Sequence, residues 1–228
     1  MSRNDARNPE PERTYRGQPA EARRAQRRGR LIDAAIDFMT DGEWRLVTVE
    51  KLCAAAGLNK RYFYESFDGL DAVAAAAIDD IAERVQVAAL AALAETAADP
   101  VERQAHAAAA AVVRTLTDDP RRARVLLGGV AVGSTAHHLH RARVIRRLTA
   151  VLVGHARSVH DVRLESDPLA QLAPAFMIGG TADAILAFIE GRAVVTHDEL
   201  VDSLATLWLL TGNGAVDLAQ QRAAAHPD

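Results

Sequence analysis

This chain of 228 residues has little of what several fold classes require. It contains one cysteine, Cys53, which excludes an internal disulfide, and aromatic residues make up only 4% of it. Scarce aromatics and abundant alanine disfavour a β-sandwich and favour closely packed helices. The first 30 residues contain no signal-peptide pattern, and no later run approaches the ~20 apolar residues of a membrane span. We therefore expect an all-α, cytoplasmic protein that has no membrane partner.

The sequence also lacks the patterns that carry most enzyme chemistry. It has no His-Cys-Asp/Glu cluster, Gly-rich phosphate loop or nucleophile elbow, and the acids between 79 and 83 fit the wet face of a helix. His137, His138 and His140 lie close together, but no nearby Cys, Asp or Glu completes a metal site, so we interpret them as part of a solvated basic face. We expect no catalytic residues, no metal and no cofactor.

What the chain does contain is a stretch, residues 48–67, that predicts two short helices joined by a tight turn. Thr48 can cap the first helix, Gly57 can end it in the left-handed conformation, and Asn59 can cap the second. The first helix has one apolar stripe at positions i, i+3, i+4 and i+7, formed by Val49, Leu52, Cys53 and Ala56. This spacing is typical of a helix-turn-helix.

The second helix of this pair predicts a basic and aromatic outer face. Phe63 and Phe67 are four residues apart and should face inward. The residues left outward are Lys60, Arg61, Tyr62, Tyr64 and Ser66. Such a face suits the recognition helix of a DNA-binding motif, which lies in the major groove.

Positive charge is concentrated near this motif. Residues 1–70 carry 13 Arg plus Lys against 11 Asp plus Glu, whereas the remainder carries 14 against 19. Arg27 and Arg28 belong to an arginine cluster at the start of the preceding helix, where they can clamp phosphates or reach into a minor groove. The charge asymmetry therefore supports an N-terminal nucleic-acid interface.

The region 28–73 resembles the DNA-binding domain of TetR-family (tetracycline-repressor-like) transcriptional regulators. One departure is Leu70, which stands where the family often has a phosphate-contacting lysine at the start of its fourth helix. We expect that helix to start there nevertheless, with Asp68 and Asp71 as its cap. The matching anchors are Arg28, Leu31, Ile32, Ala34, Ala35, Phe38, Gly42, Thr48, Ala56, Gly57, Tyr64 and Phe67.

The resemblance implies a one-component regulator, most often a repressor, that binds a palindromic double-stranded DNA operator as a homodimer and is released by a small-molecule effector. In this picture Tyr64 and Lys60 contact phosphates, while Arg61 and Tyr62 read bases. The predicted DNA-binding residues are Arg27, Arg28, Thr48, Asn59, Lys60, Arg61, Tyr62, Tyr64 and Ser66. Alternatives are an architectural DNA binder without an effector, a body that binds a protein partner, and an all-α enzyme.

About nine helices are expected in two parts. Residues 1–20 should be a disordered basic arm, 21–69 the three-helix head, 70–212 a helical effector-binding and dimerisation body, and 213–228 a flexible tail. The helices of the body should span 70–96, 101–117, 120–132, 135–162, 169–191 and 197–210. The first of these is the only continuous element expected to join head and body.

Two further sites are predicted in the body. Polar or aromatic residues on apolar stretches are candidates for an effector pocket, although each polar one can equally be a satisfied buried group: His106, His155, Phe176, Thr181 and Asp183. The last two helices carry more apolar surface than a monomer needs, and the resemblance implies a four-helix dimer contact there. The candidate interface residues are Ile185, Phe188, Leu204 and Trp208.

Overall fold

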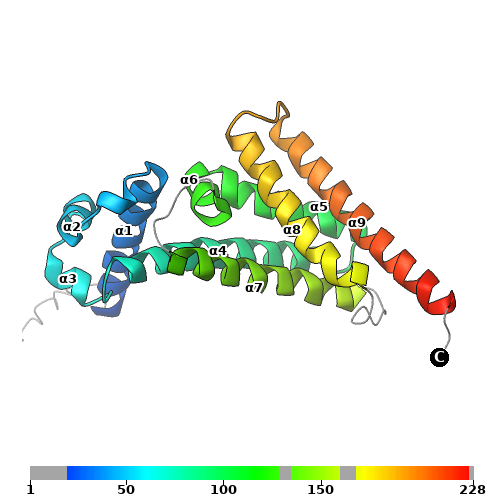
Figure 1. Cartoon of the computed structure of the whole chain (residues 1–228), viewed down its shortest axis with the longest axis horizontal. Coiled ribbons are helices and arrows are strands. Elements are labelled where there is room, and N and C mark those ends of the chain that lie inside the picture. Colours follow the sequence, from blue (N-terminus) through cyan, green and yellow to red (C-terminus); the bar gives the residue numbers. More distant parts are fainter. Residues whose placement is uncertain (1–19, 129–134, 160–167, 226–228) are drawn as a thin grey trace, which may run out of the picture.

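The computed structural model describes residues 20–128, 135–159 and 168–225, and all regular structure in these ranges is helical. A small head of three helices sits at one end of an elongated body (Figure 1). The all-α prediction is confirmed. The elements are α1 Ala20–Thr40, η1 Trp44–Leu46, α2 Val49–Ala56, α3 Lys60–Tyr64, α4 Leu70–Glu95, α5 Val101–Thr117, α6 Pro120–Ala123, η2 Arg124–Gly128, α7 Thr135–Val159, α8 Pro168–Ile189 and α9 His197–Ala225.

The predicted helix-turn-helix forms through the caps that the sequence indicated. The Thr48 hydroxyl accepts a hydrogen bond from the Lys51 amide, 3.2 Å away, at the start of α2. Gly57 ends α2 with φ 60° and ψ 40°, a left-handed conformation that a side chain would strain. Asn59 then caps α3 by accepting a 3.1 Å hydrogen bond from the Tyr62 amide. These three residues fix the angle between the two helices.

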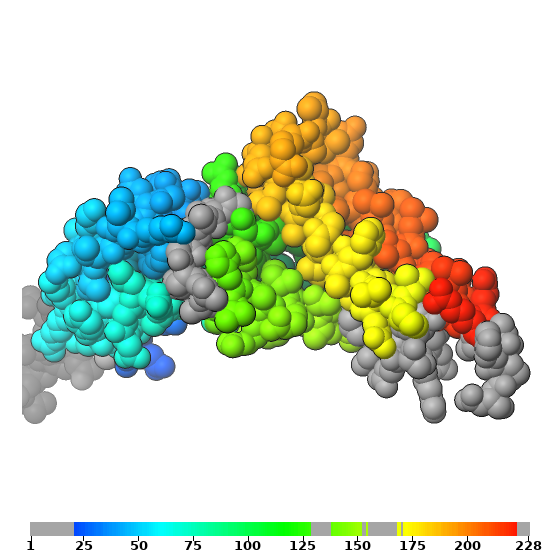
Figure 2. Space-filling model, in the orientation of Figure 1, coloured from blue at the N-terminus to red at the C-terminus, as the bar shows by residue number. Residues whose placement is uncertain are grey.

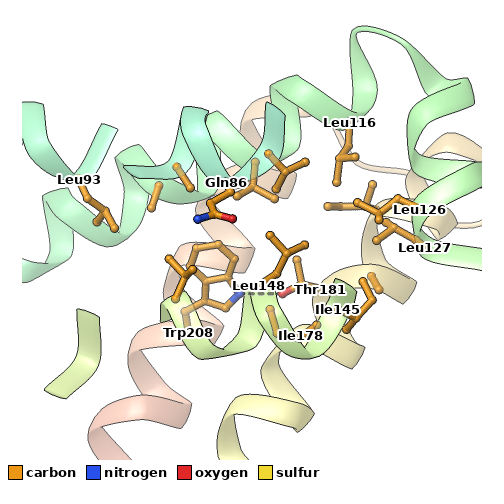
Figure 3. Close-up of a pocket in the computed structure, with 17 residues that line it drawn as sticks. Gln86, Leu93, Leu116, Leu126, Leu127, Ile145, Leu148, Ile178, Thr181 and Trp208 are labelled. Atoms are coloured by element: carbon orange, nitrogen blue, oxygen red, sulfur yellow. Dashed lines mark hydrogen bonds between the residues drawn. The ribbon is translucent and has the colours of Figure 1, made fainter. Parts of the chain in front are cut away.

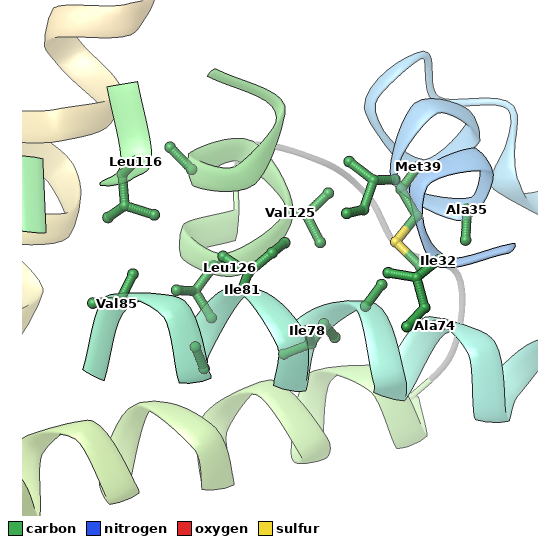
Figure 4. Packing of buried hydrophobic residues seen from close by; sticks show 14 of the residues in the cluster. Ile32, Ala35, Met39, Ala74, Ile78, Ile81, Val85, Leu116, Val125 and Leu126 are labelled. Carbon is green, nitrogen blue, oxygen red and sulfur yellow. The ribbon is translucent and has the colours of Figure 1, made fainter. Parts of the chain in front are cut away.

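The core of the head continues into the body without a break (Figure 4). Met39 of α1 is fully buried, as are Ala74 of α4 and Val125 of η2. The head therefore packs on the body through η2 as well as through α4, the continuous element that joins the two parts. A shift of η2 should displace the head, because close-packed interiors transmit displacement.

The ends of several elements differ from the predictions, and so does one helix cap. The helix predicted over 120–132 is a single α-helical turn, α6, followed by the π-helical turn η2, and residues 129–134 lie outside the described ranges. The N-cap of α4 is Gly69, which makes no side-chain cap bond, so Asp68 is not the cap. Instead of ending at Leu210, α9 runs to Ala225, because Val216 and Ala219 are buried and hold its last turns. The predicted tail is thus largely helix, whereas the predicted arm (1–20) falls almost entirely outside the described residues.

The expectation that no run is long enough to cross a membrane was wrong for α8. Its segment Gln171–Ile189 is long and apolar enough by length and composition alone, with a mean hydropathy of 1.7. Only 22% of that segment is buried within the protomer. Most of its other residues are half-buried, and the large apolar side chains of α8 that are exposed are Leu172 and Phe176.

Candidate nucleic-acid interface and effector cavity

Of the five residues predicted to form the outer face of α3, Lys60, Arg61 and Tyr64 are exposed, whereas Tyr62 and Ser66 are half-buried. Arg61 has a side chain that is 83% exposed, and Tyr64 is 61% exposed, although it follows the fully buried Phe63. Phe63 is locked in place by the rings of Tyr64 and Phe67, whose centroids lie 5.2 and 6.1 Å from its own. A rigid inner face thus presents a cationic and phenolic outer face.

Lys60, at the first turn of α3, is engaged in an ion pair within the head. Its ammonium donates a hydrogen bond to the carboxylate of Glu50 in α2. This bond lowers the pKa of Glu50 and raises that of Lys60, so both groups stay charged at neutral pH. Glu50 therefore competes with any phosphate for Lys60.

Arginines from α1 fasten the head helices to one another around Glu65, the residue that ends α3. Arg24 donates a 2.6 Å hydrogen bond to the Glu65 carbonyl, and Arg61 donates a 3.0 Å bond to its carboxylate. The guanidinium of Arg27 lies 3.9 Å from the same carboxylate and stacks 4.4 Å from the centroid of the Tyr62 ring. This role of Glu65 was not predicted, because no sequence motif marks a single acidic residue in a basic segment as the partner of several arginines.

The other predicted DNA-binding residues have structural partners in the described head. The guanidinium of Arg28 lies 4.6 Å above the Phe67 ring. Ser66 is half-buried, and its backbone amide donates to the Phe63 carbonyl at 2.9 Å. The side chains of Thr48 and Asn59 serve as helix caps. The side chains on this face that project furthest into solvent are Arg61 and Tyr64. Leu70, where a lysine was expected from the family, is half-buried and packs on the core.

The body contains a cavity of about 110 Å³ between α4, α5, η2, α7, α8 and α9. The space-filling view shows a hollow between α7 and α8 (Figure 2). All but three of the described lining residues have purely aliphatic side chains. The three are Gln86, Thr181 and Trp208, and the Trp208 indole donates a 2.8 Å hydrogen bond to the Thr181 hydroxyl (Figure 3).

Of the residues predicted for an effector pocket, only Thr181 is found to line this cavity. His106 is exposed and its Nε2 lies 3.0 Å from the Asp202 carboxylate, which ties α5 to α9. Asp183 is exposed and lies 3.5 Å from Arg192, and Phe176 is 72% exposed. The side chain of His155 lies outside the described residues. Sequence reasoning erred here because it sought polar residues, whereas the cavity is lined by aliphatic ones.

Three of the four residues predicted for a dimer interface face the interior of the protomer. Ile185 and Leu204 are buried, and Trp208 lines the cavity. Phe188 is partly buried, with its ring 6.4 Å from that of His197. These residues of α8 and α9 therefore pack within the chain, and the contact with a second copy stays a prediction. The exposed apolar residues of the two helices are Leu172, Phe176, Leu207, Leu210 and Leu218.

An ion-pair cluster links the head to the wall of the cavity. Arg121 of α6 binds Asp37 of α1 and forms bonds of 2.7 and 2.8 Å to the carboxylate of Asp119, the N-cap of α6. The hydrogen bond from Arg121 lowers the pKa of Asp119. The next element, η2, contributes Leu126 and Leu127 to the cavity. Arg121 therefore lies between the cavity and the head.

The histidine and arginine segment at the start of α7 contacts α4. His140 Nε2 lies 3.2 Å from a carboxylate oxygen of Asp79, although the direction of approach does not make a hydrogen bond. His138 Nδ1 lies 3.4 Å from the Arg141 guanidinium, whereas the side chain of His137 is outside the described residues. Within the described ranges no group of three or more His, Cys, Asp or Glu could hold a metal ion.

Comparison with solved structures identifies the architecture. No family model and no curated protein matches the sequence. A putative transcriptional regulator from Pseudomonas aeruginosa PAO1 is similar in structure with a TM-score of 0.69 and 22% identity, covering 88% of this chain and 100% of that one. A putative TetR-family regulator from Syntrophomonas wolfei gives 0.68 at 10% identity, over 83% and 96% of the two chains. The fatty acid degradation regulator FadR from Bacillus halodurans gives 0.67 at 18% identity, over 82% and 95%.

Together, the head and the cavity-containing body define a two-part helical protein with an N-terminal helix-turn-helix. Its fold is that of the TetR-like transcriptional regulators.

Proposed function

We propose that this protein is a cytoplasmic transcriptional regulator that binds double-stranded DNA through its head. The observation that carries the proposal is α3, whose inner face is anchored by Phe63 while Arg61 and Tyr64 project into solvent. A helix presented in this way can enter the major groove, where arginine reads guanine edges. The similar fold of solved transcriptional regulators supports the same conclusion.

The regulator acts as a homodimer through the exposed apolar face of α8 and α9. A soluble monomer would leave Leu172, Phe176, Leu207 and Leu210 in water, each of them more than half exposed. A second copy covers this face and also holds two heads at a fixed distance, as successive major-groove faces about 34–36 Å apart require. The open backbone at Gly179 and Gly180 allows a close approach of the partner helix.

We further propose that the protein is a repressor released when a small molecule occupies the cavity. Leu126 and Leu127 line the cavity, and Val125 beside them lies in the core shared with α1. A ligand that displaces η2 also strains the Arg121 to Asp37 ion pair and reorients the head. A coupling of ~1–3 kcal/mol, about 5–150-fold in DNA affinity, is typical of such linkage.

Arg61→Ala tests whether α3 reads bases. We expect the variant to bind its operator about 5–150-fold more weakly, because a bidentate guanine contact is worth ~1–3 kcal/mol, and to lose discrimination at one base position per half-site. Fluorescence anisotropy with a set of operator variants at fixed salt measures both effects. Arg84→Ala is the matched control, since Arg84 also forms an exposed i,i+4 ion pair, with Asp80, but lies on α4. Equal affinities of the two variants for every operator would contradict the assignment of Arg61.

A further inference from the structure

The lining of the effector cavity disfavours ligands that carry a charged group. Of the described residues that line it, none carries an ionisable side chain. A buried carboxylate or ammonium without a partner is strongly disfavoured, and such a group on a ligand would have no counter-charge here. This excludes cationic and anionic groups from the buried end of a ligand.

One polar group in the wall has no partner among the described residues. The side-chain amide of Gln86, which is half-buried on α4, makes no hydrogen bond within this part of the chain and points into the cavity (Figure 3). The Trp208 indole, by contrast, already donates to Thr181. Gln86 offers both a donor and an acceptor, so it can pair with a neutral hydroxyl, carbonyl or amide.

The volume of the cavity limits how many atoms of a ligand it can enclose. A volume of about 110 Å³ is comparable to an engineered apolar cavity of roughly 150 Å³ that binds benzene. A ring or alkyl segment of about six carbons therefore fits before the surrounding helices move. A larger molecule would have to extend through the hollow between α7 and α8 or displace η2.

We propose that the effector is an uncharged molecule with an apolar body and one neutral hydrogen-bonding group that pairs with Gln86. This inference rests on the proposed function, of which it specifies the ligand class. Aliphatic side chains from five elements, α4, α5, η2, α7 and α8, surround the body of the ligand, while the Gln86 amide fixes its polar end. Apolar walls with a small number of convergent polar groups are the usual form of a small-molecule site.

The probes that test this are hexan-1-ol, hexanoate and hexylammonium, which share chain length and differ in charge. Binding is followed by Trp208 fluorescence in a Trp44→Phe background, which leaves Trp208 as the single tryptophan. We expect hexan-1-ol to bind and both ions to bind at least ~30-fold more weakly, because neither finds a counter-charge. Tighter or equal binding of either ion, or no binding of the alcohol, would overturn the proposal.

Two variants assign the binding to this cavity. Ala89→Leu should fill the space and abolish the response while thermal unfolding stays cooperative. Gln86→Leu should weaken hexan-1-ol about 10-fold, as expected for one lost hydrogen bond. Undiminished binding by Ala89→Leu would place the ligand elsewhere, and undiminished binding by Gln86→Leu would refute its pairing with the amide. Failure of bound hexan-1-ol to change operator affinity would leave the neutral site standing and refute only the effector-release part of the proposed function.

Discussion

Replacing Leu207 and Leu210 by glutamate is expected to convert the protein from dimer to monomer. Both side chains are exposed in the protomer, at 55% and 66%, so the substitutions cost the monomer little. In the dimer they would place four unpaired carboxylates in an apolar contact, where burial of charge is strongly unfavourable. Sedimentation velocity measures the outcome directly.

The same double variant should lose about 10²–10⁴-fold in operator affinity, because a lone head no longer gains the effective concentration that the second head provides. Val87→Glu is the matched control, since Val87 is 61% exposed but lies on α4. The control should stay dimeric and bind the operator normally. If the Leu207/Leu210 double variant remained a soluble dimer, the interface would lie on another face. If the double variant gained affinity for lipid vesicles, α8 would have a membrane as its partner.

Phe63→Ala is expected to cause the largest loss of stability of any single substitution in the head, about 3–5 kcal/mol. The Phe63 side chain is fully buried and contacts two neighbouring rings, so its removal leaves a cavity beneath α3. Urea unfolding, followed by the fluorescence of Trp44 in the head, reports this loss.

Tyr64→Ala is the control for Phe63→Ala, because the two residues are adjacent aromatics of the same helix, one exposed and the other buried. Tyr64 is largely exposed, and its removal should change the free energy of unfolding by less than about 1 kcal/mol while weakening DNA binding. Equal loss of stability in the two variants would mean that α3 is not anchored by its inner face.

Local signals made the head predictable from the sequence. The caps at Thr48 and Asn59 and the left-handed Gly57 act within a few residues of their positions, so the turn between α2 and α3 could be predicted before any packing was known. The ion pair between Glu50 and Lys60 could not be predicted from the sequence, because their contact depends on the angle between two helices.

The body was harder to predict because its helices are apolar on more than one side. Leu204 and Leu207 of α9 look alike in the sequence, yet one is buried and the other is exposed. The cavity gave no signal at all, since aliphatic residues that line a void have the same pattern as those that fill a core. Glycine is disfavoured inside a helix, yet α9 continues through Gly212 and Gly214 because Val216 beyond them is buried.

Selection of bound fragments from random double-stranded DNA tests the central claim, that a dimer reads DNA through α3. The account predicts an enriched inverted repeat whose half-sites are centred about 34–36 Å apart, or a multiple of that distance. It also predicts that Arg61→Ala changes the recovered sequence within each half-site. Recovery of no common site, or of the same site by the parent protein and by Arg61→Ala, would contradict it.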